Sequence, residues 1–300
     1  MTSPWFYALA AALVSANTLA ADPLTRPIAS PYAKEWLKPQ RPLRIHGDTY
    51  YVGFGGLSLV LIDSKAGLIL IDGALPQAVP AIAANIQQLG FNIEDVKYIL
   101  NTEAHFDHAG GIAALARDSG AITVSSPAGI AALAGGHVLA NDPQAGQIDA
   151  FAPVSKLQAI GDGETLHLGN TAISAHFTPG HTPGSTSWSW RSCQNGQCVD
   201  IVFGASLNAV SADRFHFSAA ANQSSTAVFR SGIRNFAQLP CDILISAHPD
   251  HSGFDQKLQQ AARQPASNPF IDPQACRNYA AKYEQKLDAR LAREAAGAHE

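Results

Sequence analysis

Charge is scarce in this chain of 300 residues: Asp, Glu, Lys and Arg make up 15%, with 20 Lys plus Arg against 24 Asp plus Glu. No run of Lys or Arg provides the positive surface that a phosphate backbone binds, so we expect no nucleic-acid partner. The hydrophobic content of 46% is enough for a full buried core. The sequence therefore predicts a globular, slightly acidic protein.

Long apolar runs are also missing, except near the N-terminus, where residues 5–16 are apolar. Small residues at Ala20 and Ala21 suit a signal peptidase, although no Lys or Arg precedes the run. We expect residues 1–21 to be a cleaved signal peptide, residues 22–300 to form a single domain, and the mature protein to be periplasmic, without membrane contact. The alternatives are an uncleaved anchor or a buried N-terminal helix.

Cysteine is limited to four residues, and no two of them form a Cys-x-x-Cys pair, which argues against a four-cysteine zinc site. An oxidising compartment permits disulfides instead. Asn195-Gly196 is a tight-turn signal that brings its flanking strands face to face. We therefore expect Cys193 to pair with Cys198 across this turn, and Cys241 to pair with Cys276 across a longer loop.

Strand-like and helix-like segments alternate along the chain. Two β-rich halves with flanking helices predict an α/β protein of the αββα sandwich class, without a linker between the halves. We expect strands at 57–63, 68–72, 96–100, 171–177, 186–190, 199–203 and 243–246, and helices at 77–89, 111–117, 225–236 and 272–295.

Four potential metal ligands crowd into one short turn directly after the strand expected at 96–100. They are Glu103, His105, Asp107 and His108. Such side chains are costly to bury unless something pairs with them, and zinc accepts both imidazole nitrogen and carboxylate oxygen. The turn therefore predicts a zinc site at the end of a strand.

Two further histidines follow strand-like runs. His181 lies between two Pro-Gly pairs in residues 178–185, which stiffen the turn and preorganise the side chain, and His248 follows the strand expected at 243–246. Because strand ends can converge, both are candidate ligands. His251 is a candidate for supporting a ligand, although we favour a structural role for it. We expect no catalytic role for the remaining histidines: His46, His137, His167, His176, His216 and His299.

The Glu-x-His-x-Asp-His run at 103–108, the Gly-His-Thr-Pro-Gly-Ser-Thr segment at 180–186 and the Ala-His-Pro at 247–249 together resemble the metallo-β-lactamase superfamily. The resemblance is closest to the third subclass of class B β-lactamases and covers nearly everything after the signal region. It implies two Zn²⁺ per chain, with a metallo-β-lactamase fold. One zinc would be held by Glu103, His105 and His181, and the other by Asp107, His108 and His248.

This chain departs from the family's usual pattern at Glu103, where the family usually has His. A carboxylate adds negative charge and makes the bound zinc a weaker Lewis acid, so we expect the zinc at Glu103 to be the more labile. The alternative is that Glu103 is a bystander. Asp72 also resembles a family position that supports the metal site, and a plain strand-ending turn is the alternative there.

A second departure separates subfamilies within the resemblance. Glyoxalase-type, lactonase-type and many nuclease-type relatives carry an acidic metal-bridging residue where this chain has Ala205, and subclass-one β-lactamases have Cys near the place of Ser206. Both differences favour the third subclass.

The function that the resemblance implies is hydrolysis of the β-lactam amide by a metal-activated hydroxide, which gives antibiotic resistance. Asp107 would orient the hydroxide, and Ser206 and Asn208 would donate hydrogen bonds to the carboxylate of this small-molecule substrate. One alternative is a zinc hydrolase of the same fold that acts on another ester, lactone or thioester. Another is a non-catalytic periplasmic zinc-binding protein.

Overall fold

Two β-sheets face each other at the centre of the computed structural model, which describes residues 22–264 and 268–297. The predicted signal peptide, residues 1–21, lies outside the described residues. The seven-stranded sheet runs in the order β1 (Leu43–His46), β2 (Thr49–Tyr51), β3 (Val60–Asp63), β4 (Leu68–Ile71), β5 (Val96–Leu100), β6 (Ile122–Ser125) and β7 (Leu157–Ala159). The five-stranded sheet runs in the order β12 (Ile243–Ser246), β11 (Gln197–Gly204), β10 (Thr186–Gln194), β9 (Thr171–Phe177) and β8 (Thr165–Leu168).

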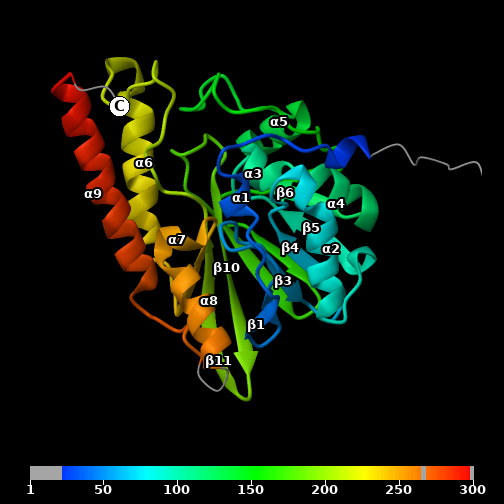
Figure 1. Cartoon of the computed structure of the whole chain (residues 1–300). Coiled ribbons are helices and arrows are strands. Elements are labelled where there is room, and N and C mark those ends of the chain that lie inside the picture. The colour runs from blue at the N-terminus through cyan, green and yellow to red at the C-terminus, as the bar shows by residue number, and fades with distance from the viewer. Residues whose placement is uncertain (1–21, 265–267, 298–300) are drawn as a thin grey trace, which may run out of the picture.

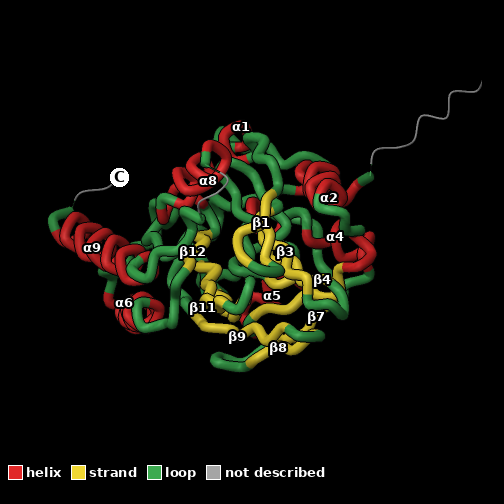
Figure 2. Tube along the Cα trace, turned by 90° about the horizontal axis from the view of Figure 1, so that it is seen from below, coloured by secondary structure: helices red, strands yellow, loops and turns green. Residues whose placement is uncertain are grey.

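Helices cover the outer face of each sheet. In both views α2 and α4 lie on one flank, whereas α6 and α9 lie on the other (Figures 1 and 2). This arrangement confirms the predicted αββα sandwich. The helices are α1 (Ala33–Trp36), α2 (Val79–Gln88), α3 (Phe106–Ala109), α4 (Ile112–Ser119), α5 (Pro127–Gly135), α6 (Gln223–Phe236), α7 (Pro249–Ser252), α8 (Phe254–Arg263) and α9 (Ala275–Ala295), with short 3₁₀ turns at Pro23–Thr25, Pro76–Ala78, Ile93–Asp95 and Ala220–Asn222.

Successive side chains of a strand point to opposite faces of its sheet. The apolar side chains of the two sheets therefore pack into three layers, one between the sheets and one between each sheet and its helices. In β4, Leu68 and Leu70 face the helix layer of α2 and α4, whereas Ile69 and Ile71 face the second sheet. In β12, the middle residue Leu244 packs against α6 and α9, and its neighbours face the first sheet. The continuous apolar runs of these strands therefore reflect burial on both faces.

Most predicted elements form within a few residues of their expected bounds. Strands β5, β9 and β12 have the bounds that the sequence predicts, and β3 and β4 pair antiparallel around the predicted turn. Helix α9 begins at Ala275 rather than at 272, because the Asp272 carboxylate accepts a hydrogen bond from the amide of Gln274 and so forms a turn before the helix. No helix within the described residues is long and apolar enough to cross a membrane.

Both predicted disulfides are confirmed. Cys193 and Cys198 are directly opposite in the β10–β11 hairpin and are bonded. Its turn has left-handed backbone at Asn195 and Gly196, with φ of 51° and 79°, as the hairpin signal predicts.

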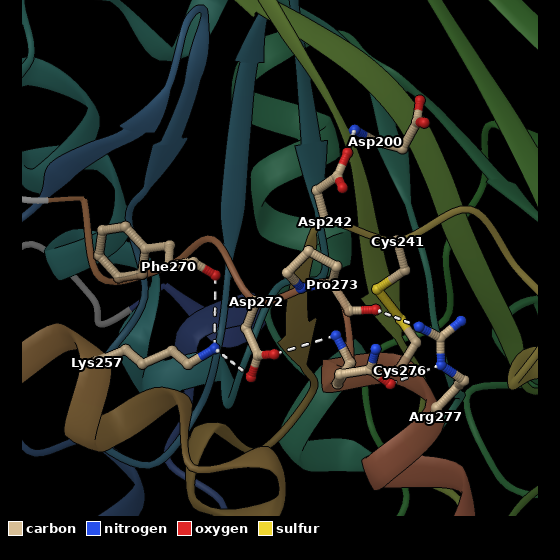
Figure 3. Close-up of a disulfide and its surroundings, with 10 residues drawn as sticks. Asp200, Cys241, Asp242, Lys257, Phe270, Asp272, Pro273, Cys276 and Arg277 are labelled. Atoms are coloured by element: carbon tan, nitrogen blue, oxygen red, sulfur yellow. Dashed lines mark hydrogen bonds and ion pairs between the residues drawn. A yellow bond between two sulfur atoms is a disulfide. The ribbon is translucent and has the colours of Figure 1, made fainter.

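The second disulfide joins Cys241 to Cys276, 35 residues apart (Figure 3). Beside it, the amide of Asp272 donates to the carbonyl of Asp242 at 2.7 Å. These two links attach the start of α9 to the start of β12. The far end of β12 leads to His248, so the disulfide braces an element that carries a candidate ligand.

Candidate metal centre

The predicted ligands lie on turns at the ends of strands from both sheets. Glu103 and His105 follow β5, and the one-turn helix α3 presents Asp107 and His108. His248 follows β12 and precedes α7. Rigid strands therefore position every one of these turns.

The turn that carries His181, between β9 and β10, has a strict steric requirement. Gly180 has φ of +148°, and a Cβ at this position would lie 2.0 Å from the ring of Phe229 in α6. Only glycine fits this close approach and this backbone conformation. Within the turn, the Thr182 amide donates to Ser185 Oγ at 3.1 Å, which stiffens the loop further.

Each of the four histidines has one ring nitrogen held by a protein acceptor. Such a contact fixes the ring and leaves its other nitrogen to bind a metal. The contacts are His105 Nε2 to Asp142 Oδ2 at 3.2 Å, His181 Nδ1 to the Asn208 carbonyl at 3.1 Å, His248 Nδ1 to the Gly56 carbonyl at 3.0 Å and His108 Nδ1 to Asp72 Oδ2 at 3.5 Å.

The remaining donor atoms converge in one buried space. His108 Nε2 lies 3.1 Å from Glu103 Oε1 and 3.1 Å from His248 Nε2, and Asp107 Oδ2 is 3.4 Å from both imidazoles. His181 Nε2 lies 3.7 Å from Glu103 Oε1. These contacts link the five residues into one connected cluster.

His105 joins the cluster through its ring, whose centroid is 4.9 Å from that of His181. The three donor residues that lie nearest to one another are not one of the two ligand sets that the resemblance implies. Ligand atoms of Glu103, His108 and His248 all lie within 4.8 Å of one another, which places Glu103 between the expected sites.

The electrostatics of the cluster show that charged groups are held together in a site from which water is largely excluded. Burial opposes ionisation of Glu103, but the imidazoles of His108 and His181 lower its pKa to about 2. Burial likewise opposes ionisation of Asp107, and His108 with His248 hold its pKa well below the ordinary value. Burial disfavours the charged form of His108, but Asp107 and Glu103 raise its pKa well above the usual range.

These shifts make the donor set suitable for a divalent cation. The raised pKa of His108 means that a positive charge there offsets the buried carboxylates, and a metal ion would replace its proton with a larger positive charge. Carboxylate oxygens and imidazole nitrogens, with the outward nitrogens already fixed, are a donor set that binds zinc. The site therefore fits the metal that the sequence predicts.

Two buried carboxylates support the ligands. Asp72, which the sequence left undecided, accepts from the amide and hydroxyl of Thr102 at 2.8 and 2.6 Å and contacts His108. Asp142, which sequence reasoning missed, is 3% exposed and fixes His105. The only signal for Asp142 was an acidic residue in a loop after α5, which does not indicate a contact with the ligand turn.

Ser206 and Asn208 lie after β11, beside the cluster. Both hydrogen-bond donors of Ser206 are directed at the carboxylate of Glu103. The Asn208 carbonyl holds His181, while its side-chain oxygen is buried without a hydrogen-bond partner among the described residues. His251 packs on His248 with ring centroids 4.8 Å apart, and burial lowers its pKa to about 2.

Comparison with known proteins agrees with the site. A family model for the metallo-beta-lactamase superfamily matches residues 52–226. A solved B3 metallo-β-lactamase, described as the first with an active-site glutamic acid, is 49% identical, with a TM-score of 0.85, over 92% of this chain and 99% of that chain. MEM-A1, a subclass B3 metallo-β-lactamase from a soil metagenome library, is 46% identical, with a TM-score of 0.84, over 87% of this chain and 99% of that chain.

Among curated proteins, the uncharacterized protein YobT of Bacillus subtilis (strain 168) is 31% identical over 145 residues, which are 47% of this chain and 59% of that protein. The chain thus matches little more than half the length of this curated relative. The fold, the buried donor set and the family model define the class. The chain belongs to the metallo-β-lactamase superfamily, and within it to subclass B3, the subclass of both solved relatives above.

Proposed function

We propose that this chain holds two zinc ions and hydrolyses the β-lactam amide bond of antibiotics. One observation carries the proposal: two carboxylates and four imidazoles meet in one buried cluster. In each imidazole, the ring nitrogen that points away from the cluster is already held by a protein acceptor. Solved relatives of the same subclass, 49% and 46% identical, support it. The substrate is a small molecule, and we propose no nucleic-acid partner.

We propose the ligand sets that the family pattern implies. His105 through Nδ1 and His181 through Nε2 would join Glu103 at the first zinc. His108 and His248 through Nε2 would join Asp107 at the second. Zinc held by these residues would lower the pKa of water toward about 7 and would thus make hydroxide available as a nucleophile at neutral pH.

The protein's own residues position the reaction. Asp107 is buried and its pKa lies well below the ordinary value, so the carboxylate stays ionised at neutral pH and can accept a hydrogen bond that orients the attacking oxygen. Asn208 lies beside His181 and is our candidate for contact with the substrate carboxylate. Trp36 packs on His248 with centroids 5.7 Å apart and shields this ligand from solvent.

The alternative ester, lactone or thioester hydrolase is not favoured. Ala205 is fully buried at the position where such relatives carry an acidic bridging residue, and its carbonyl accepts a hydrogen bond from the Tyr279 hydroxyl at 3.2 Å. This position offers no metal ligand. The non-catalytic alternative requires filled coordination, whereas catalysis needs a position open to water.

We also propose export to the periplasm, by a signal peptide at 1–21, with a single domain over 22–300. The two disulfides support this location, because such bonds persist in oxidising compartments. Antibiotic resistance would be the consequence of hydrolysis there.

The experiment that tests the proposed reaction compares wild-type protein with Asp107→Ala on a panel of penicillin, cephalosporin, carbapenem, lactone and thioester substrates. We expect β-lactams to be the preferred class and Asp107→Ala to lose roughly 10²-fold or more of the rate. Preference for a lactone or thioester would contradict the proposed substrate. Turnover of no substrate by the zinc-loaded protein would favour the non-catalytic alternative.

A further inference from the structure

Ser206 offers both of its donors to one carboxylate. Its amide donates to Glu103 Oε2 at 2.7 Å and its hydroxyl donates to Glu103 Oε1 at 2.8 Å. Both residues are 1% exposed, so water does not compete for these bonds. We infer that Ser206 is a positioning residue for Glu103, which holds the carboxylate so that one oxygen is presented to the metal.

The geometry gives the two oxygens of Glu103 different tasks. Oε1 faces the cluster, 3.1 Å from His108 Nε2 and 3.7 Å from His181 Nε2, whereas Oε2 is directed at the backbone beyond β11. A carboxylate with both oxygens free can bind a cation through one oxygen, through two, or by bridging. The Ser206 contacts restrict these choices, because moving Oε2 toward the metal would break its bond to the amide.

The residues around the pair make this arrangement rigid. Asn101 Nδ2 donates to the Glu103 carbonyl at 2.9 Å, which fixes the main chain under the ligand. On the other side, the Ala205 amide donates to Ser187 Oγ at 3.1 Å and the Ala205 carbonyl accepts from Tyr279. The backbone next to Ser206 is thus held by Ser187 of β10 and by Tyr279 of α9, and the position of Ser206 in turn fixes Glu103.

The need for such a residue follows from the ligand type. An imidazole is held by one contact to its outward nitrogen, as the four histidines of this site show. A glutamate side chain has more rotatable bonds, and when buried it requires donors to replace its hydration. Ser206 supplies these donors and immobilises the carboxylate at the same time.

This inference rests on the proposed zinc site at Glu103, and the experiment separates the two. Zinc content and zinc dissociation constants are measured by elemental analysis and chelator competition for wild type, Ser206→Ala and Ser206→Gly. Cobalt(II) substitution reports the geometry of the first site through its visible spectrum. The matched control is Ser125→Ala, a fully buried serine whose hydroxyl has no hydrogen-bond partner among the described residues.

We expect Ser206→Ala to weaken one of the two zincs by about 10-fold to 100-fold, in the range found for residues that orient metal ligands, and to leave the other unchanged. Added zinc should restore kcat, and KM should change little. Ser206→Gly, which also removes the hydroxyl but keeps the amide, should show the same loss and provides the test if the alanine variant does not fold. Ser125→Ala should retain wild-type zinc affinity.

A second arm repeats Ser206→Ala in a Glu103→His background. Because the carboxylate is then absent, the serine change should no longer alter zinc affinity. Unchanged zinc binding in Ser206→Ala and Ser206→Gly, with a raised KM that zinc does not rescue, would overturn the inference and leave a substrate contact. An equal loss of zinc in the histidine background would also overturn it. Wild-type protein that binds no zinc would instead reject the proposed function.

Discussion

Oε1 of Glu103 lies closer to Nε2 of His108, at 3.1 Å, than to Nε2 of His181, at 3.7 Å. The glutamate therefore borders both proposed zinc sites, although the family pattern assigns it to one. Its negative charge would act at short range on an ion at either site, so we propose that Glu103 determines zinc occupancy as well as serving as a ligand.

Replacing Glu103 by histidine should tighten the first zinc. A neutral imidazole removes a buried negative charge and leaves the zinc a stronger Lewis acid. We expect Glu103→His to lower the first zinc dissociation constant by roughly 10-fold, measured by chelator competition. Two equally tight zinc sites in the wild-type protein would contradict the expected weakness at Glu103.

Asp142 should act through His105, whose Nε2 it contacts at 3.2 Å. Asp142→Asn keeps the shape of the side chain but weakens its hold on the ring. We expect zinc affinity to fall by about 10-fold to 100-fold, as for other carboxylates that orient ligating histidines. Asp118→Asn, on the exposed surface of α4, is the control and should change nothing. Equal zinc affinity of Asp142→Asn and wild type would show that His105 does not depend on this contact.

The two disulfides should differ in their contribution to stability. Cys241 and Cys276 close a loop with a separation of 35 residues, and Cys193 and Cys198 one of 5. By chain-entropy reasoning, losing the longer link costs about 4 kcal/mol of unfolding free energy and losing the shorter one about 2 kcal/mol. Denaturant unfolding of the two paired Cys→Ser variants measures both values, and a larger loss in the hairpin variant would refute this order.

Glu294 should stabilise the loop after Asn208 in a pH-dependent manner. Burial opposes its ionisation, but the amide of Ser218 at 2.7 Å and the side chain of Arg290 lower its pKa. A lowered pKa in the folded state means stability that is present above the unfolded value, about 4.3, and lost as the pH falls through the folded value. Glu294→Gln should cost about 1 to 2 kcal/mol at pH 7.

Unfolding of Glu294→Gln and wild type followed at pH 7 and pH 3 gives the check. The difference between the two proteins should shrink at the lower pH, because pH 3 lies below the unfolded pKa of about 4.3, and proton binding to the unfolded wild-type chain reduces the advantage of the ionised carboxylate. A difference that stays constant with pH would mean that the charge of Glu294 does not contribute.

The sequence predicted those features that are carried by local patterns. Uninterrupted apolar runs identified β4 and β12, and the spacing of Glu103 to His108 identified the ligand turn before any contact was known. Short strands such as β7 and β8, with three and four residues, were missed because so few residues show little alternation.

The contacts that complete the site depend on the tertiary fold and could not be predicted. Asp142 reaches His105 only because the loop after α5 returns to the ligand turn, and no pattern in the sequence indicates this contact. The sequence placed Ser206 near the site but could not show that its two donors are taken by Glu103. Which ring nitrogen of each histidine is held by the protein is likewise a property of the assembled structure.

The most direct test of the proposed function follows β-lactam hydrolysis together with zinc content while a chelator is added and zinc is then returned. The account predicts two zinc ions per chain in the loaded protein, loss of turnover as they are removed, and recovery on adding zinc. Turnover that continues at the same rate after complete metal removal would contradict it.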